Sequence, residues 1–309
     1  MKKVLWVLLI VLVAGNGALL LTLTPETLPT GPAPTVTPPA AQPPSAMKLA
    51  AIKAGLMVTL ASNAYRGANL VEVRDFNMGG ILVRHPQGNL LFDAGFGRDY
   101  AAHSKTAPLL MRMTALLRKE PTVAEQLRAA GIELATLRGV VLTHAHWDHV
   151  SGLADLPGVP VWVTQPELDY IHSGESLAQL AASLPDVKFQ VYDFTGGPYL
   201  GFAKSHDVFG DGSVVMVPAP GHTPGSVIAF IATPDGKRYA LIGDIAWQKE
   251  GVEIPAQRPW LPRQLADSDA AATRALLVRL HELQQALPGL VIVPAHDRRV
   301  WNSLPGLAG

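Results

Sequence analysis

The chain has 309 residues, of which 48% are hydrophobic, and it contains 28 Gly, 26 Pro and no Cys. This length allows one large domain or two small ones. Its 25 basic and 25 acidic residues give a formal net charge of zero, so no long-range field attracts a polyanion and a nucleic-acid partner is disfavoured. The lack of Cys excludes disulfides, a thiolate nucleophile and thiolate metal ligands.

Residues 1–24 are expected to form a membrane anchor or a signal peptide. Lys2 and Lys3 precede residues 4–23, a mostly apolar run without charge whose length is close to that of a spanning helix. We favour an uncleaved anchor, because residues 15–17 form a poor cleavage site and the apolar run continues beyond them. Basic residues stay in the cytoplasm, so the body is expected to be periplasmic or otherwise extracytoplasmic, held at the inner membrane if the segment is uncleaved.

Residues 25–46 are rich in proline, with Thr and Ala between the prolines. This composition predicts an extended polyproline-type spacer that packs on nothing and has no regular secondary structure. The globular part is expected at residues 47–309, as one α/β domain.

The first predicted elements of this domain are strands. Residues 69–74 alternate as a strand, and residues 80–84 and 90–93 are predicted to form a hairpin around a Pro/Gly turn. His85 lies in that turn and is expected to be exposed to solvent.

Two helices are predicted next. Residues 105–119 carry Leu and Met at helical spacing, which we interpret as a core helix. The alternative is a lid or entrance wall for an apolar substrate, because this segment follows the loop at Asp93 directly. The second helix, at residues 122–130, is expected to end at Gly131.

The motif H-A-H-W-D-H, at residues 144–149, follows the apolar run 140–142. Neutral imidazoles and ionised carboxylates bind metal ions. In an extended segment His144 and His146 share a face and can converge on one ion. Asp148 and His149 point apart unless the backbone turns, which suits a second ion. The alternative is a run of surface histidines, but this spacing seldom arises by chance.

Further strands are predicted at residues 159–163 and 187–194, on either side of a helix at 166–184 whose His172 is expected to face solvent. The loop at residues 195–210 is rich in Gly and aromatic residues, and we expect some of its side chains to contact the substrate. These are Tyr199, Phe202, His206 and Phe209.

Three later segments each add one candidate ligand. His222 lies in a Pro/Gly loop between strands at 213–217 and 227–231, while Asp244 and His296 follow apolar strands. Each alone is more often a satisfied polar group than a ligand, but all three stand at strand ends, where α/β folds gather their site residues. With the motif they provide five His and two Asp, enough for two metal ions with a shared carboxylate and open positions. A last helix is predicted at residues 269–287.

From about Asn77 to His296, these motifs resemble those of the metallo-β-lactamase superfamily of dinuclear metallohydrolases, in the same order. The resemblance implies a four-layer αββα sandwich with the site along one edge. It also implies that Asp93 orients a ligand His, a role that metal sites commonly need. The ligands that the resemblance assigns are His144, His146 and His222 for the first ion, Asp148, His149 and His296 for the second, and Asp244 as the bridge.

A hydrolase of esters or lactones is the function that we predict. Two adjacent divalent ions make a bridging hydroxide available near neutral pH to attack a substrate carbonyl, and Asp148 is the candidate catalytic residue. Imidazole and carboxylate ligands fit Zn best, with Fe, Mn or Co as alternatives. The expected partner is a small-molecule ester or lactone.

The loops around His222 and Asp244 look most like those of N-acyl-homoserine lactonases, the quorum-quenching enzymes, so lactone hydrolysis is one candidate activity. Those enzymes commonly place Tyr three residues after the bridging Asp, where this chain has Trp247. An indole N–H can donate a hydrogen bond but cannot relay a proton. The alternative is an organophosphate or phosphodiester hydrolase. A β-lactamase ranks lower because the His-rich β-lactamases lack the bridging carboxylate, and a non-catalytic metal-binding envelope protein ranks lower because no ligand is missing.

Overall fold

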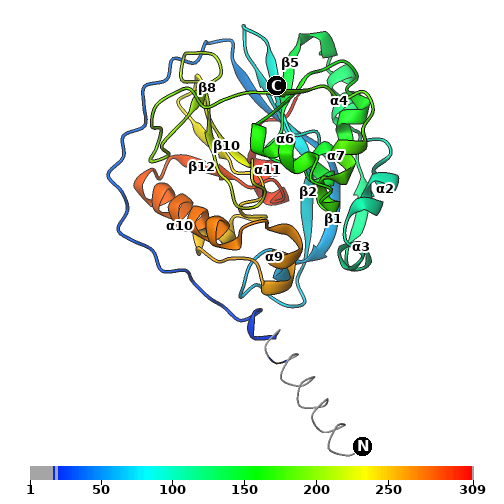
Figure 1. The fold of residues 1–309 in the computed structure, drawn as a ribbon. Helices are drawn as coiled ribbons and strands as arrows, with labels where there is room; N and C mark the ends of the chain where they lie inside the picture. The colour runs from blue at the N-terminus through cyan, green and yellow to red at the C-terminus, as the bar shows by residue number, and fades with distance from the viewer. Residues whose placement is uncertain (1–16, 18–19, 308–309) are drawn as a thin grey trace, which may run out of the picture.

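Two β-sheets form the centre of this computed structural model, which describes residue 17 and residues 20–307 (Figure 1). Their strands are β1 Lys48–Leu60, β2 Val73–Arg84, β3 Asn89–Phe92, β4 Leu116–Lys119, β5 Leu137–Val141, β6 Val161–Val163, β7 Phe189–Val191, β8 His206–Asp207, β9 Val214–Pro218, β10 Val227–Ala232, β11 Arg238–Leu241 and β12 Leu290–Val293. The larger sheet has seven strands in the order β4-β1-β2-β3-β5-β6-β7. The smaller sheet has five, in the order β12-β11-β10-β9-β8.

The helices lie mostly on the outer sides of the two sheets, although the last of them packs its Trp301 side chain between the sheets (Figure 1). They are α2 Tyr100–His103, α3 Leu109–Thr114, α4 Val123–Ala129, α5 Trp147–Val150, α6 Gln165–Ile171, α7 Gln179–Ser183, α8 Glu250–Glu253, α9 Trp260–Ala266, α10 Ala270–Ala286 and α11 Arg298–Ser303. Capping side chains determine where some of these helices begin. Thr122 and Glu125 form a capping box at α4, and the Asp269 side chain accepts hydrogen bonds from Ala271 N and Ala272 N at α10.

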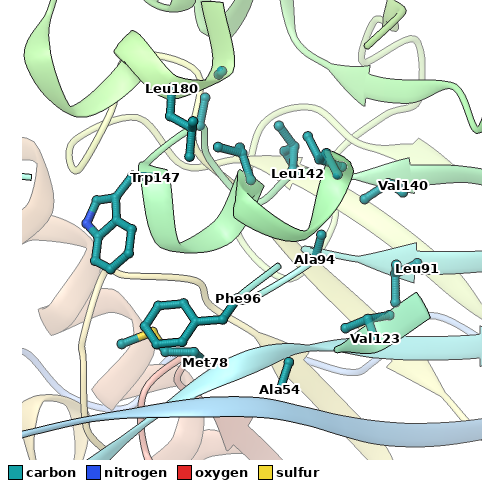
Figure 2. Close-up of a cluster of buried hydrophobic side chains, with 14 of the residues drawn as sticks. Ala54, Met78, Leu91, Ala94, Phe96, Val123, Val140, Leu142, Trp147 and Leu180 are labelled. Atoms are coloured by element: carbon teal, nitrogen blue, oxygen red, sulfur yellow. The ribbon is translucent and has the colours of Figure 1, made fainter. Parts of the chain in front are cut away.

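Three apolar layers show how the sheets and helices stack. Between the two sheets, Val83 and Val141 pack in one cluster with Met216 and Ile231. Leu277 and Leu280 of α10 pack on the outer face of the smaller sheet. A third cluster joins the larger sheet to its helices; Figure 2 shows part of it, including Phe96 and Trp147, whose stacked rings are 5.3 Å apart. The order helix, sheet, sheet, helix confirms the predicted αββα sandwich.

β1 is a strand that the sequence analysis did not predict. It pairs with β2 along almost its whole length, from Lys48 with Arg84 to Leu60 with Val73. Alternate residues of β1 face different layers: Leu49 and Ala51 lie between the sheets, while Ala50 and Ile52 face the helices. Because both faces are buried, the sequence lacks the polar–apolar alternation that marks a half-exposed strand.

The prediction of one core helix at residues 105–119 is wrong. Only Leu109–Thr114 is an α-helix here, and Leu116–Lys119 forms β4, which pairs with β1. Leu109 and Met113 are 62% and 74% exposed. The strand pairing overrides the helical spacing of the apolar residues. The predicted helix at 166–184 is likewise divided into α6 and α7, and His172 between them is exposed as expected.

The aromatic residues of the 195–210 loop do not reach the site. Tyr199 and Phe202 are buried against Phe230 in the cluster under α10, because they cover the apolar outer face of β10. Phe209 stacks on His85, with 3.7 Å between ring centroids. His206 in β8 lies beside Tyr192. The expectation that these residues contact substrate is therefore wrong.

His85 is buried, not exposed to solvent as the sequence analysis expected. Its side chain lies under the ring of Phe209, and its Nε2 is 3.0 Å from Asp211 Oδ2. The loop before β9 covers the predicted hairpin turn. This contact joins segments that are far apart in the chain, so the local sequence does not predict it.

Residues 25–46, named here the Pro-rich strap, have no helix or strand, as predicted, yet they pack on the body. Leu28 is 1% exposed and joins the cluster between the smaller sheet and α10. Leu28 N donates to Pro255 O at 2.8 Å, and Gln42 N donates to Asp211 O at 2.7 Å. The expectation that this segment packs on nothing is wrong, because its one Leu fills a core position.

The predicted anchor or signal peptide lies mostly outside the described residues, which begin at 17 and 20. Within residues 20–307, no helix is both long enough and apolar enough to span a membrane.

Candidate metal centre

The seven predicted ligands converge at one edge of the two sheets. The motif follows β5, and His222, Asp244 and His296 follow β9, β11 and β12. Three groups among them have ligand atoms within 4.8 Å of one another and could each hold a metal ion. These groups are His144, His146 and His222; His144, His149 and Asp244; and Asp148, His149 and His296. The buried His/Asp clusters are consistent with a dinuclear metal site.

Asp244 lies between the two ends of this cluster. Its Oδ2 is 3.5 Å from His222 Nε2, and its Oδ1 is 3.0 Å from His296 Nε2. The carboxylate is also 3.3 Å from His149 Nε2. A carboxylate that reaches both groups has the position that a bridging ligand needs.

Unpartnered polar atoms show that these residues fit a metal ion. His144 Nε2, His149 Nε2 and Asp244 Oδ1 are buried, and although they lie close to other polar atoms of the cluster, none makes a hydrogen bond of suitable geometry within the described structure. Leaving such an atom unsatisfied costs about 1–3 kcal/mol, so native proteins rarely leave three together. Cations at this place would satisfy all three.

Asp93 holds the motif in place. Its Oδ1 accepts a hydrogen bond from Thr143 N at 2.7 Å, and its Oδ2 lies 2.9 Å from His149 Nδ1. The residue has a φ of 58°, in the left-handed region that residues other than glycine seldom adopt. Asp93 therefore contacts the imidazole of His149, one of the predicted ligands, as the sequence analysis expected. His296 Nδ1 is held in the same way, 2.7 Å from Asn77 O.

Glu167 is a buried residue of α6 that the sequence analysis did not select. Its Oε1 accepts from Ala145 N at 2.5 Å, and its Oε2 accepts from Thr223 Oγ1 at 2.6 Å and from Gly225 N at 3.0 Å. One carboxyl group thus ties the His144–His146 segment to the His222 loop. A Cβ on Gly225 would lie 2.2 Å from Glu167 N, so only glycine allows this approach. Thr164 and Pro166 in the sequence mark the start of a helix, but nothing local shows that Glu167 points inward.

Arg258 and Asp267 were also missed. Asp267 Oδ1 is 2.8 Å from His222 Nδ1 and forms an ion pair with Arg258. Arg258 Nη1 donates to the backbone oxygen of Asp244 at 2.7 Å. The pair thereby connects two of the predicted ligands, His222 and Asp244. Both residues come from the connection between β11 and α10, which carries no strand-end signal.

Burial and neighbouring charges set the protonation of the cluster. Burial, and then the adjacent imidazoles His149 and His222 respectively, hold the pKa of His144 and of His146 well below the usual value. Burial opposes protonation of His149 too, but the carboxylates around it, chiefly Asp93, raise its pKa well above the usual value. The pKa of Asp244 is lowered despite its burial, by the surrounding histidines. Neutral imidazoles and an ionised carboxylate are what metal ligation requires.

Burial raises the pKa of Glu167 to about 7, although its three hydrogen-bond donors favour the carboxylate. This group therefore holds its proton far more readily than an exposed glutamate does.

Two adjoining cavities lie in front of the cluster. The smaller, about 20 Å³, is lined by His146, Asp148, His222, Asp244 and His296. The larger, about 210 Å³, is mainly apolar and lies between α3 and α9, with Leu110 and Leu261 among its walls. Met57, Met111 and Trp247 line both cavities. Leu110, Met111 and Thr114 of α3 thus form a wall beside the site, which agrees with the alternative weighed for the 105–119 segment.

Trp247 connects the cluster with the larger cavity. Its Nε1 donates a hydrogen bond to Asp244 Oδ2 at 2.8 Å. The guanidinium carbon of Arg258 lies 4.9 Å from the ring centroid of Trp247. The indole N–H therefore orients the carboxylate in this structure.

Comparison with known proteins agrees with this geometry. The metallo-beta-lactamase superfamily profile matches residues 80–296. A probable metallo-hydrolase of Mycobacterium tuberculosis is 32% identical over 245 residues, which cover 72% of this chain and 75% of that protein. The N-acyl homoserine lactonase AttM of Rhizobium radiobacter is 25% identical over 228 residues, which cover 71% of this chain and 81% of AttM.

Among solved structures, an N-acyl homoserine lactone hydrolase with the product N-hexanoyl-L-homoserine bound at its catalytic metal centre has the same fold. The TM-score is 0.65 at 20% identity, over 84% of this chain and 96% of that one. The sequence profile, the fold and the His/Asp cluster all agree. The chain therefore belongs to the metallo-β-lactamase superfamily, as a metal-dependent hydrolase.

Proposed function

We propose that this protein hydrolyses esters or lactones that carry an apolar acyl chain, on the outer side of the cytoplasmic membrane. The observation that carries the proposal is the apolar cavity of about 210 Å³ that adjoins the His/Asp cluster through Trp247, Met57 and Met111. A substrate whose carbonyl lies at the cluster can place its acyl chain in that cavity. The apolar run at residues 4–23 supports the location.

His144, His146 and His222 would hold one divalent ion, and Asp148, His149 and His296 the other, with Asp244 between them. Zn suits these ligands best. When bound, the two ions supply Lewis-acid polarisation of a carbonyl and a water of lowered pKa.

The side chains of the cluster and its neighbours have two roles: one of them transfers protons, and the others hold the site in place. Asp148 lines the smaller cavity, and its side chain is 11% exposed, so its carboxylate can take up a proton from water and return it to the leaving oxygen. Asp93 and Glu167 hold the ligand segments rigid while this occurs. Trp247 bounds the acyl cavity and keeps its N–H on Asp244, so it acts as a hydrogen-bond donor and does not relay protons.

Similar proteins support the choice of substrate. AttM is named an N-acyl homoserine lactonase, and the solved structure carries an acyl-homoserine product at its metal centre. N-acyl-homoserine lactones are therefore the first substrates to test, in parallel with an aryl phosphotriester.

The test is metal content of the full-length protein together with both hydrolysis assays. About two ions per chain and turnover of the lactone are expected. Turnover of the phosphotriester alone would replace the proposed substrate class by organophosphates. One ion or none would contradict the dinuclear site.

Asp148→Ala tests the role of the carboxylate. Loss of this proton acceptor should lower kcat by roughly 100- to 10,000-fold, and loss of the ligand should reduce the metal content below two ions per chain. Asp169→Ala, at an exposed aspartate of α6, is the matched control and should change neither quantity. Unchanged turnover in Asp148→Ala would contradict the mechanism.

A further inference from the structure

Exposed large apolar side chains gather at one end of the molecule. We name six of them the apolar rim: Leu70, Val71, Leu109, Met113, Leu116 and Trp260, which are between 47% and 81% exposed. Val191, on β7, is also exposed but lies on the opposite edge strand of the larger sheet from β4. A soluble surface rarely concentrates large apolar side chains in this way without a partner.

Strand pairing and α3 bring the rim together. Leu70 and Val71 lie in the turn that joins β1 to β2, and Leu116 pairs with Val58 of β1. Thr59 Oγ1 donates to Thr114 O at 2.9 Å, which holds the end of α3 against β1. Trp260 begins α9, on the far side of the apolar cavity, and Figure 1 shows α3, α9 and the neighbouring ends of β1 and β2 at the same end of the molecule.

The mouth of the apolar cavity lies within this rim. Leu110 lines the cavity and is 45% exposed, and Leu261 lines it from α9, next to Trp260. Met111, one residue further, lines both the apolar cavity and the smaller cavity at the His/Asp cluster. A continuous apolar route therefore leads from the rim to the site.

The apolar run of the sequence joins the body at this same end. Gly67 N donates to Leu23 O, and Arg66 Nη2 donates to Leu21 O, both at 3.0 Å. Residues 4–23 carry no charged side chain. The Pro-rich strap that follows these residues is bound along the body. It therefore cannot act as a long flexible linker that would separate this apolar run from the rim.

The charges near the rim suit a lipid surface. Arg112 on α3 and Arg118 and Lys119 on β4 are exposed, and such side chains pair with lipid phosphates. Glu26 and Glu72, at the same end, are paired with Arg66 and Arg74. Trp at a rim of this kind prefers the membrane–water interface.

We propose that this end of the protein lies on the lipid bilayer, with the apolar rim among the acyl chains and the cavity mouth facing the lipid. Building on the proposed function, we infer that the substrate is an amphiphilic ester or lactone with a long acyl chain, which enters the cavity from the membrane.

Fluorescent labelling of the full-length protein in vesicles tests the docking. The chain has no Cys, so Val71→Cys and Met113→Cys each give one labelling site for an environment-sensitive dye, with Val191→Cys as the matched control. At 71 and 113 we expect a blue shift and several-fold stronger quenching by a quencher attached to lipid chains than at 191. Equal, water-like signals at all three sites would overturn the proposal. A blue shift without vesicles that grows with protein concentration would assign the rim to a second copy of the chain and overturn it as well.

Met113→Glu tests the entry route, because Met113 belongs to the rim but does not line the cavity. This variant should hydrolyse a long-chain lactone held in vesicles several-fold more slowly, and a water-soluble short-chain lactone at an unchanged rate. Equal effects on both substrates, or no effect on either, would overturn entry from the membrane. If the wild type hydrolyses no ester or lactone, the proposed function fails, whereas the labelling result still decides the docking.

Discussion

The Trp247 side chain belongs to two environments at once. Its N–H faces the Asp244 carboxylate, and its ring helps to line the apolar cavity. Around the ring, Phe76 makes an edge contact with 6.2 Å between centroids, and Arg258 stacks on it. The orientation of the expected bridging carboxylate is therefore fixed by a residue that also lines the apolar cavity.

Trp247→Phe removes the N–H and keeps an aromatic ring. Asp244 Oδ2 then loses its 2.8 Å donor, and we expect the metal affinity to fall by about 10- to 100-fold. Competition with a chelator measures the change. Trp162→Phe is the control, because the buried Trp162 Nε1 has no partner within the described structure and its loss should leave metal affinity unchanged. Equal affinities for wild type and Trp247→Phe would contradict this role.

The candidate ligands could be predicted from the sequence because they lie at, or within a short loop after, the ends of apolar strands. His144 and Asp244 need only the local strand end and the common edge of the sheets to be placed. The residues that hold them could not be predicted in this way. Glu167 and Asp267 reach the site from a helix and a long connection, so their partners are set by tertiary packing and not by spacing.

The secondary-structure predictions were wrong where tertiary packing, and not the local sequence, decides between helix and strand. β1 was missed because both of its faces are buried, and β4 was taken for helix because leucines at 109–117 fit a helical period. The strands that lead into the ligands were placed correctly, since each is short, apolar and followed by Gly, Pro or a polar residue.

The Pro-rich strap stabilises the domain through Leu28. Leu28→Ala should lower the free energy of unfolding by up to about 2–5 kcal/mol, and by less if the strap detaches before the core unfolds. Thermal unfolding and the rate of proteolysis within residues 25–46 measure the two effects. The exposed Thr27→Ala is the control. If Leu28→Ala leaves both quantities unchanged, the strap does not contribute to stability.

At the scale of the molecule, metal binding to the cluster is expected to release protons. Carboxylates raise the pKa of His149 and of His296 although burial opposes this, so both imidazoles tend to be protonated without metal. Ligation needs neutral imidazole, and metal affinity should therefore increase as the pH rises through and beyond the usual range of histidine. Calorimetric titration in buffers of different ionisation heat counts the protons released. A metal affinity that is the same at acidic and alkaline pH would contradict this expectation.

Glu167 has a consequence for how the two halves of the chain are joined. It belongs to the half that builds the larger sheet, yet Thr223 and Gly225, which donate to it, belong to the half that builds the smaller sheet. The candidate ligands divide in the same way, with His144 to His149 on one side of this seam and His222 to His296 on the other. The candidate metal centre thus also joins the two sheets, and separating the sheets at this edge would move the two sets of candidate ligands apart.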